Sequence, residues 1–423
     1  MFKKALSLIL VVVMFSALAL SLASCGKEVV ADMTAAPLTE VELKKDFTVP
    51  ADFKLGIICL HDEASTYDLN FINGVEKIKT VLGLTDAQVI YKKNIPESAA
   101  CTEAADDLVD QGCKIVFANS FGHESFLLTS AKKHPEVQFC HATGTTAHTE
   151  DTPNFHNAFA SIYEGRYLAG VAAGLKLNEM IADGKINGDA PKMGYVGAFT
   201  YAEVISGYTS FFLGAKSVCP SVTMEVQFTG SWYDEIKEKE AATALINNGC
   251  DLISQHADSM GAPSICEERG VPNVSYNGAT DETCPGTFIV SSRIDWAPYY
   301  LYIIKQLCTG AEIADDWCGG VEEGSVVLTG VNKTAAAEGT LEKIQEVAAK
   351  LKDGSVKVFD TNTFTINNGQ KVADDHLADV DTDAAYTPDT DVVDGGEFRE
   401  SLYRSAPYFD LRIDGIKLLN EKF

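Results

Sequence analysis

Basic residues are scarce in this sequence of 423 residues: 34 Lys and Arg stand against 60 Asp and Glu, so the formal net charge at pH 7 is −26. A surface of this sign repels nucleic acid and anionic lipid headgroups. It also disfavours phosphorylated or polyanionic ligands. An excess of acid serves solubility as well, which is the simpler explanation of the charge. We therefore expect no nucleic-acid partner.

The signatures of common catalytic and metal sites are also missing. The sequence contains no GxxxxGK[ST] phosphate loop, no GxGxxG after a strand, no GxSxG elbow and no HExxH motif. Its cysteines form no CxxC pair or zinc pattern. His141, His148 and His156 are seven and eight residues apart, which describes loop histidines better than metal ligands. We therefore expect neither an enzyme nor a bound metal or cofactor.

The first 24 residues have the pattern of a secretory signal. Lys3 and Lys4 give a basic start, residues 6–20 form an apolar run, and the sequence Leu-Ala-Ser-Cys then ends at Cys25. The apolar run is too short for a membrane span. Leu-Ala-Ser-Cys resembles the lipobox of bacterial lipoproteins, which implies cleavage before Cys25 and a diacylglycerol on its sulfur. An ordinary cleaved signal or a retained anchor is the alternative.

These features predict an exported chain that is attached by lipid to the extracytoplasmic face of the cell membrane. Residues 1–24 would be the signal peptide and residues 25–49 a polar tether. Removal of Lys3 and Lys4 with the signal leaves 32 basic residues against 60 acidic ones, or a net charge of −28.

Eleven cysteines would ordinarily suggest disulfides in an exported chain, and ten remain when Cys25 is set aside. Four of them lie in or beside apolar strand-like runs: Cys59, Cys113, Cys140 and Cys250. A free cysteine in such a run behaves as a small core residue. Spacing alone does not decide whether Cys266 pairs with Cys284, or Cys308 with Cys318. We expect most of the ten to be reduced.

The first half of the chain alternates between apolar runs and amphipathic stretches. Strands are expected at residues 54–60, 88–91, 114–118, 137–141 and 155–160, and helices at 68–82, 98–111 and 124–133. Helical stretches separate most of these strands, which follow one another about every 25 residues or more, and this spacing is typical of a parallel sheet. The sequence therefore predicts an α/β lobe.

The same alternation starts again after residue 162. A helix at 163–177, rich in small residues that permit close packing, precedes strands at 192–197, 222–228, 252–255 and 272–276, with helices at 202–217, 234–247 and 259–269. Further on we expect strands at 288–291, 325–328 and 357–359 and helices at 296–308 and 341–351. Residues 371–396 are Asp-rich, and we expect them to form an extended segment on the surface. Residues 409–413 are expected to return to the edge of a sheet. The sequence therefore predicts two α/β lobes with a ligand cleft between them.

Candidate ligand-binding residues cluster after two predicted strands of the second lobe. Trp232 and Tyr233 follow one strand, and Gln255, His256 and Asp258 end another. In open α/β sheets, ligands bind at the carboxyl ends of the strands. Aromatic rings beside hydrogen-bonding groups suit the capture of a flat heteroaromatic molecule better than the breaking of a bond.

Four segments resemble the basic membrane protein family of lipoproteins, also called PnrA-like, which are substrate-binding proteins of ABC importers for purine nucleosides and related molecules. They are Tyr163-Glu164-Gly165-Arg166-Tyr167-Leu168-Ala169-Gly170, Gly194-Tyr195-Val196-Gly197, Gly230-Ser231-Trp232-Tyr233-Asp234 with Lys237-Glu238-Lys239-Glu240-Ala241-Ala242, and Gln255-His256-Ala257-Asp258-Ser259. The resemblance extends over about residues 54–369. The last two segments resemble a branch thought to take adenine or other bases.

The resemblance implies a type I periplasmic-binding-protein fold, with two doubly wound parallel-sheet lobes joined by a hinge. The first lobe would contain residues 50–158 and about 290–330, and the second 159–289 and about 331–423. Chain crossings are expected near residues 158–162, 287–292 and 330–334. We further expect a monomer that closes on a small molecule and delivers it to an ABC permease in the membrane.

The resemblance also assigns roles to single residues. Trp232 stands where the family stacks an aromatic ring on the purine, and such stacking contributes about 1 to 3 kcal/mol. Phe121 is the expected partner on the other lobe, and Asp68, beside Tyr67, is the acid expected near the base. Tyr163, Gln255, His256 and Asp258 would add polar contacts. The alternatives are a core role for Trp232 and a structural role for His256.

Two positions depart from the nucleoside-binding pattern. Where those relatives carry a ribose-binding acid, this chain has Tyr276-Asn277-Gly278-Ala279, so that Asn277 replaces a carboxylate. A lysine expected farther on is Arg293. Together these departures favour a free base, such as adenine or hypoxanthine, over a nucleoside.

Other functions remain open at the level of sequence. Because fold does not fix ligand, a receptor for a sugar or riboflavin is an alternative. A sensor that presents its ligand to a signalling partner is another. An extracytoplasmic nucleoside hydrolase or deaminase is the least favoured, since it would need an acid cluster or a zinc signature.

Overall fold

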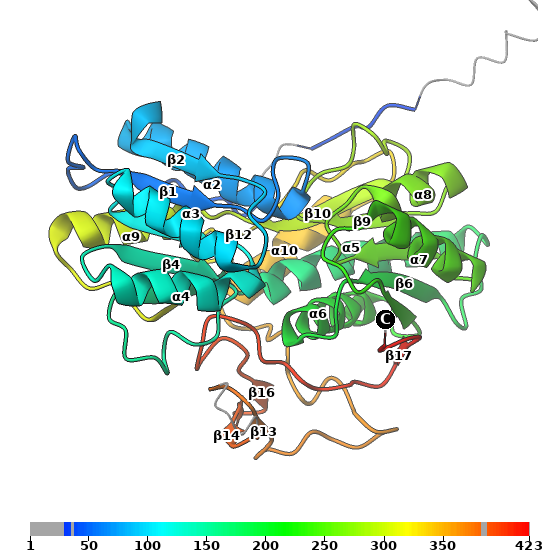
Figure 1. Cartoon of the computed structure of the whole chain (residues 1–423). Coiled ribbons are helices and arrows are strands. Elements are labelled where there is room, and N and C mark those ends of the chain that lie inside the picture. The colour runs from blue at the N-terminus through cyan, green and yellow to red at the C-terminus, as the bar shows by residue number, and fades with distance from the viewer. Residues whose placement is uncertain (1–28, 35–37, 382–386, 423) are drawn as a thin grey trace, which may run out of the picture.

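The computed structural model describes residues 29–34, 38–381 and 387–422 (Figure 1). It consists of two α/β lobes, side by side in Figure 1, with the carboxyl-terminal part of the chain running along one side of both. This is the type I binding-protein architecture that the sequence predicts. The predicted signal peptide and Cys25 lie outside the described residues.

The first lobe contains a six-stranded sheet in the order β11-β5-β4-β3-β1-β2, and every neighbouring pair is parallel. The strands are β1 (Leu55–Ile58), β2 (Val89–Lys92), β3 (Ile115–Ala118), β4 (Gln138–Ala142), β5 (Phe155–Ala160) and β11 (Asp316–Gly319). All residues of β1, β3 and β5 are buried, as expected for strands covered on both faces. The sequence analysis did not find β11.

Four helices and two short 3-10 turns surround this sheet. They are α2 (Thr66–Leu82), α3 (Ala99–Asp110), α4 (Glu124–Lys133) and α9 (Ala297–Thr309), with η1 (Asp86–Gln88) and η2 (Phe121–His123). The ends of α2 follow from local chemistry. The Ser65 side chain accepts a hydrogen bond from the Asp68 amide at the start, and Gly83 ends the helix at a φ of 70°.

The second lobe contains a seven-stranded sheet in the order β12-β10-β9-β8-β6-β7-β17. The strands are β6 (Lys192–Gly197), β7 (Thr223–Phe228), β8 (Leu252–Gln255), β9 (Asn273–Tyr276), β10 (Phe288–Ile294), β12 (Val326–Leu328) and β17 (Ile416–Leu418). The helices are α5 (Ile162–Ala182), α6 (Ala202–Val218), α7 (Glu235–Asn247), α8 (Gly261–Arg269) and α10 (Thr340–Lys352). The pairing of β10 with β12 is antiparallel, and the other pairs are parallel.

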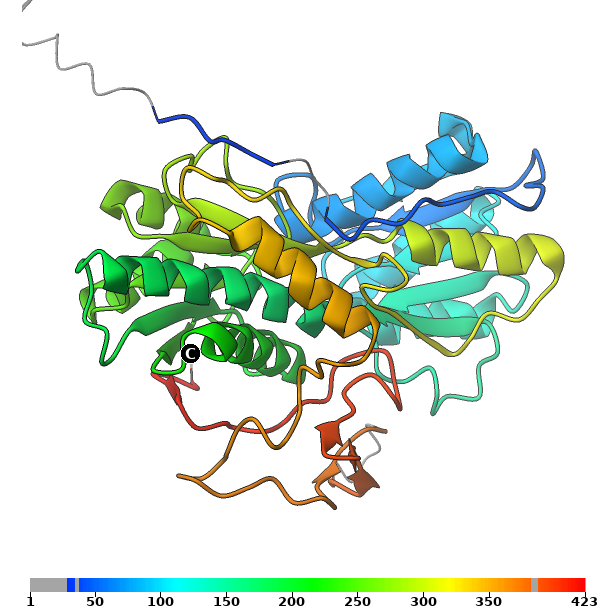
Figure 2. The same ribbon diagram turned by 180° about the vertical axis from the view of Figure 1, so that it is seen from behind.

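Helices α5 and α6 lie against each other at very short range, and α10 crosses α5 on the outside (Figure 2). A Cβ atom on Gly170 would lie 2.0 Å from the Phe211 carbonyl oxygen, and one on Gly214 would lie 2.0 Å from that of Tyr167. Only glycine fits at such an approach of two backbones. The small residues of α5 therefore permit the close packing that the sequence predicts.

The three crossings between the lobes lie between β5 and α5, between β10 and α9, and between β11 and β12. The first falls within the expected residues 158–162, but the other two differ. Strand β10 stays in the second sheet as far as Ile294, and β12 rejoins that sheet at Val326. The return to the first lobe therefore spans residues 295–319 and not 290–330, because β10 is longer than its apolar core suggests.

The carboxyl-terminal segment departs most from expectation. Residues 357–359 form no strand; instead Phe359 stacks on Phe409 at 4.3 Å and contacts Tyr163 at 5.1 Å. Two hairpins follow, made by β13 (Leu377–Ala378) with β14 (Thr390–Asp391) and by β15 (Val393–Asp394) with β16 (Glu397–Phe398). The return to the sheet edge is β17, not the expected 409–413, and it pairs with β7.

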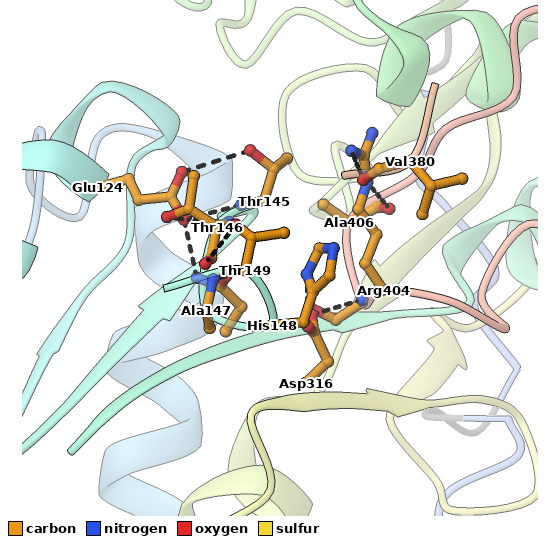
Figure 3. A network of polar contacts seen from close by, with 12 residues as sticks. Glu124, Thr145, Thr146, Ala147, His148, Thr149, Asp316, Val380, Arg404 and Ala406 are labelled. Atoms are coloured by element: carbon orange, nitrogen blue, oxygen red, sulfur yellow. Dashed lines mark hydrogen bonds and ion pairs between the residues drawn. The ribbon is translucent and has the colours of Figure 1, made fainter. Parts of the chain in front are cut away.

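This segment also contacts the first lobe (Figure 3). Asp316 on β11 accepts hydrogen bonds from the backbone amide and hydroxyl of Ser405, at 2.7 and 2.6 Å, and its other oxygen lies 3.2 Å from His148. Arg404 is buried and donates to three backbone carbonyls, those of Val380, Ala406 and Pro407. The end of the chain is therefore fixed to both lobes.

The described part of the expected tether packs against the two lobes. The Thr34 and Leu38 amides donate to the Val331 and Leu328 carbonyls of the second lobe at 2.9 and 2.8 Å. Farther along, Asp46 pairs with Lys305 of the first lobe at 2.6 Å. Residues 29–34 and 38–49 thus run across both lobes.

The ten described cysteines are unpaired, and eight are buried, which confirms the prediction of reduced core residues. Burial raises the pKa of most of these thiols; that of Cys140, for example, rises to about 12. Among the described helices, no stretch combines the length and the apolarity that a membrane span requires.

Candidate functional site

A pocket with a cavity volume of about 30 Å³ lies between the two lobes. Its walls are the segments that follow β1, β3 and β4 in the first lobe and β7, β8 and β9 in the second, with one residue from the start of α6. The lining residues are Leu60, His61, Tyr67, Asp68, Ser120, Phe121, Thr143, Glu203, Trp232, His256, Asp258, Tyr276 and Asn277.

In the first lobe, Asp68 presents a carboxylate that is held from two sides. Its Oδ1 accepts a hydrogen bond from Asn119 Nδ2 at 2.7 Å and from the His61 amide at 3.1 Å. The hydroxyl of Tyr67 donates to the Asn119 carbonyl at 2.8 Å, so the neighbouring ring is fixed by the same residue. Asp68 is buried in the first turn of α2, and the helix dipole there favours negative charge.

Aromatic side chains from both lobes meet at the pocket. Trp232 lies against Phe199 with ring centroids 4.9 Å apart in an edge-to-face arrangement, and Tyr201 lies 5.9 Å away. Phe121, from the other lobe, reaches Tyr201 at 5.4 Å. Trp232 and Phe121 thus line one pocket from opposite lobes, and a flat ring could be bound between such walls.

The second lobe adds a buried carboxyl group at Asp258. Its Oδ1 accepts a hydrogen bond from Asn277 Nδ2 at 2.9 Å, and Asn70 of the first lobe donates to the Asn277 carbonyl at 2.9 Å. Burial raises the pKa of Asp258 well above its usual value, and the bond from Asn277 offsets only part of that rise. The amide of Thr66 reaches the Asp258 backbone carbonyl at 3.4 Å, a second contact between the lobes.

Behind this wall lies a buried cation, Arg166 of α5. Its Nη1 donates to the Gln255 carbonyl at 2.8 Å, its Nη2 lies 3.2 Å from His256 Nδ1, and its guanidinium carbon is 3.2 Å from the centre of the Tyr276 ring. His256 Nε2 in turn lies 3.3 Å from Glu203 Oε1. Burial lowers the pKa of His256.

Seven of the ten predicted ligand-binding residues line the pocket: Tyr67, Asp68, Phe121, Trp232, His256, Asp258 and Asn277. The other three lie elsewhere. Tyr163 packs on Phe359, away from the pocket. Gln255 donates from Nε2 to the Ala257 and Ser259 carbonyls and so orders the loop after β8. Arg293 is near Asp295 and Glu40.

The sequence analysis did not select Glu203, Tyr276, Ser120 or Thr143 as ligand-binding residues, and it did not assign His61 to the site. Tyr276 ends β9 and Thr143 directly follows β4, so the rule that ligands bind at strand ends could have found both. Glu203 carries no such signal, because it lies in the first turn of α6, several residues after β6.

The pocket offers acceptors of hydrogen bonds, and no Lys or Arg side chain lines it. Three carboxyl groups, those of Asp68, Glu203 and Asp258, line it. Such a wall repels phosphate or carboxylate groups and suits a ligand that carries N–H donors. Among the described residues there is no group of three side chains that could hold a metal ion.

Two lobes that enclose a small pocket at their strand ends define a solute-binding protein. The family model described as "ABC transporter substrate-binding protein PnrA-like" matches residues 59–360, and the chain belongs to this family. It is therefore a solute-binding protein of the ABC-transporter class.

Curated relatives agree with this family. The chain is 32% identical to "Purine-binding protein BAB2_0673" of Brucella abortus over 64% of this chain and 73% of the relative. It is 33% identical to "Putative ABC transporter glucose-binding protein TsgA13" of Haloferax volcanii, over 51% of each chain. A third relative, "ABC transporter nucleoside-binding protein BmpA" of Lactococcus lactis, is 26% identical over 67% of this chain and 70% of the relative.

Solved structures share the fold at low identity. A solute-binding protein of an ABC transporter system from Conexibacter woesei has a TM-score of 0.57 and 19% identity, covering 72% of this chain and 98% of its own. One from Aeropyrum pernix has a TM-score of 0.59 and 16% identity, with coverage of 72% and 92%. The part of this chain that the family match leaves out includes residues 361–423.

Proposed function

We propose that this protein is the extracytoplasmic receptor of an ABC importer, that it binds a purine-type molecule, and that it delivers this molecule to the permease. One observation carries the ligand class: Trp232 and Phe121 line a pocket that also holds the carboxyl groups of Asp68, Glu203 and Asp258. Flat faces suit a heteroaromatic ring, and carboxyl oxygens suit its N–H groups. The name of the Brucella relative supports the same class.

A free base fits better than a nucleoside. The resemblance places Asn277 where nucleoside-binding relatives carry a ribose-binding acid. Its amide nitrogen already donates a hydrogen bond to Asp258. Its side-chain oxygen lies 3.3 Å from Asn70 Nδ2. The Asn277 side chain therefore forms hydrogen bonds within the protein, and it offers no carboxylate to the hydroxyl groups of a ribose.

A thermal-shift screen of the chain without residues 1–25 tests this proposal. The panel contains adenine, hypoxanthine, guanine, adenosine, guanosine, riboflavin, ribose, glucose and galactose. A ligand that binds only the folded state raises the melting temperature. A rise with free bases above that with nucleosides supports the proposal. A rise with sugars alone would favour the sugar receptor suggested by the name of the Haloferax relative, and a rise with riboflavin alone a flavin receptor.

Attachment by lipid at Cys25 and a monomeric state belong to the same proposal. The Leu-Ala-Ser-Cys sequence supports the first. Mass spectrometry of the membrane fraction checks it, because the Cys25→Ala variant should lack the lipid and remain unattached. Light scattering of the chain without residues 1–25 should give the mass of one copy.

A further inference from the structure

The residue whose role is least explained by the fold is Glu203. It lies in the first turn of α6, lines the pocket, and has a side chain that is 12% exposed. Its Oε1 faces His256 Nε2 at 3.3 Å. No residue in the described part of the chain donates a hydrogen bond to Oε2, so one oxygen of the carboxylate is free to meet a ligand.

The second neighbour of His256, Arg166, determines which ring nitrogen carries the proton. Arg166 can only donate hydrogen bonds, and its Nη2 lies 3.2 Å from His256 Nδ1. Nδ1 must therefore accept, which places the single proton of the neutral ring on Nε2. A doubly protonated ring would direct an N–H group at a guanidinium N–H group. The lowered pKa of His256, caused by burial, agrees with the neutral ring.

This tautomer determines what Glu203 can do. His256 Nε2–H faces Oε1 at 3.3 Å, and this electrostatic contact favours one position of the carboxylate, whose two oxygens only accept hydrogen bonds. Arg166 is itself held by the Gln255 carbonyl and the Tyr276 ring, both in the second lobe. The series Arg166, His256, Glu203 thus runs from the buried side of the second lobe to the pocket.

We propose that Glu203 is a specificity-determining residue that accepts a hydrogen bond from an amino group of the ligand, and that Arg166 is a positioning residue acting on it through His256. The inference rests on the proposed purine-type function and narrows it. An aminopurine such as adenine places N–H groups against the carboxylate. The proposal places the 6-substituent of the ring at Glu203, where an oxopurine such as hypoxanthine has a carbonyl oxygen, so that two acceptors face each other without a proton between them.

The test is calorimetric titration of the chain without residues 1–25 with adenine and with hypoxanthine. We expect adenine to bind about 10- to 100-fold more tightly. In Glu203→Gln, which keeps the shape and adds an N–H donor, adenine should bind about tenfold more weakly and the preference should shrink. Glu235→Gln is the matched control, because Glu235 lies in the first turn of α7 and is exposed; it should bind as the parent does.

Three outcomes would overturn the inference, and they are separable. Equal affinity of the parent for both bases, or an equal loss of both in Glu203→Gln, would reject Glu203 as the selecting residue while leaving purine binding intact. Absence of binding to any base or nucleoside by a chain that melts cooperatively would reject the proposed function and the inference with it.

The positioning role of Arg166 has its own readout. The ring ¹⁵N shifts of His256 at pH 7 should show an unprotonated Nδ1 and a protonated Nε2. Arg166→Lys, which still donates, should keep this tautomer, whereas Arg166→Gln should mix the two tautomers and weaken the preference for adenine. A protonated Nδ1 in the parent protein contradicts the inference, even if both variants fail to fold.

Discussion

The Asn277 side chain donates a hydrogen bond to Asp258 Oδ1 over 2.9 Å, and both residues are buried at the ends of the neighbouring strands β9 and β8. A raised pKa at Asp258 means that the folded protein retains a proton which the unfolded chain releases. The amide of Asn277 is compatible with either protonation state, whereas a second carboxylate would not be.

Asn277→Asp should therefore destabilise the protein. It replaces a donor by a like acid beside Asp258, at an expected cost of about 1 to 3 kcal/mol that grows as pH rises above the acid range. Urea unfolding at pH 5 and pH 8 measures this cost. Asn277→Ala is the control, since it removes the donor without adding charge. An Asp variant as stable as the parent at pH 8 would contradict the raised pKa of Asp258.

Trp232→Ala should weaken ligand binding much more than it weakens the fold. The ring is half-buried and rests on Phe199, and loss of stacking on a base costs about 1 to 3 kcal/mol. The measurement is the affinity for adenine together with the melting temperature without ligand. Phe228→Ala, in the core at the end of β7 just before the Trp232 segment, is the comparison that should lower the melting temperature strongly. If Trp232→Ala lowers the ligand-free melting temperature equally, the ring has a core role.

Glu400 should make the protein less stable as pH rises. Burial raises the pKa of its carboxyl group from an ordinary 4.5 to about 8, and neither carboxyl oxygen has a hydrogen-bond partner among the described residues. Between these pH values the folded state binds more protons than the unfolded state, so this group lowers the free energy of unfolding with increasing pH. Glu400→Gln should match the parent near pH 4.5 and exceed it at pH 8. An unchanging difference across this range would contradict the prediction.

The attachment of the carboxyl-terminal segment to the first lobe should depend on Asp316. Asp316→Ala removes the acceptor of both Ser405 hydrogen bonds and should increase amide hydrogen exchange around residues 397–408. The neighbouring Asp315→Ala is the matched control, because Asp315 is exposed and its side chain makes no hydrogen bond with a described residue. Equal protection in both variants would show that other contacts hold the segment.

The parts of the fold that follow from short stretches of sequence were predictable. Apolar runs such as those of β1 and β8 are recognisable because strands buried on both faces have no alternating pattern. The carboxyl end of β8 led to Asp258, and the family resemblance led to Asp68; both residues line the pocket. By the same logic, Trp232 could be placed because it follows β7.

What could not be predicted depends on contacts between distant residues. The strand β11 contains Asp316 and Trp317 and has no continuous apolar run, so only its pairing with β5 reveals it. Tyr163 was expected in the pocket, but at the start of α5 its direction is set by Phe359, almost two hundred residues later. Glu203 joins the pocket only because α6 begins beside His256.

The carboxyl-terminal segment adds a non-covalent connection between lobes that the chain itself joins by three crossings. Its final strand belongs to the second sheet, while Ser405 is bound to the first, so separation of the lobes must either extend the chain between them or release that attachment. This attachment limits how far the two lobes can separate in the protein without ligand. The conformational entropy that binding would otherwise remove is then already lost, and a receptor preorganised in this way can bind a small ligand more tightly from the same few contacts.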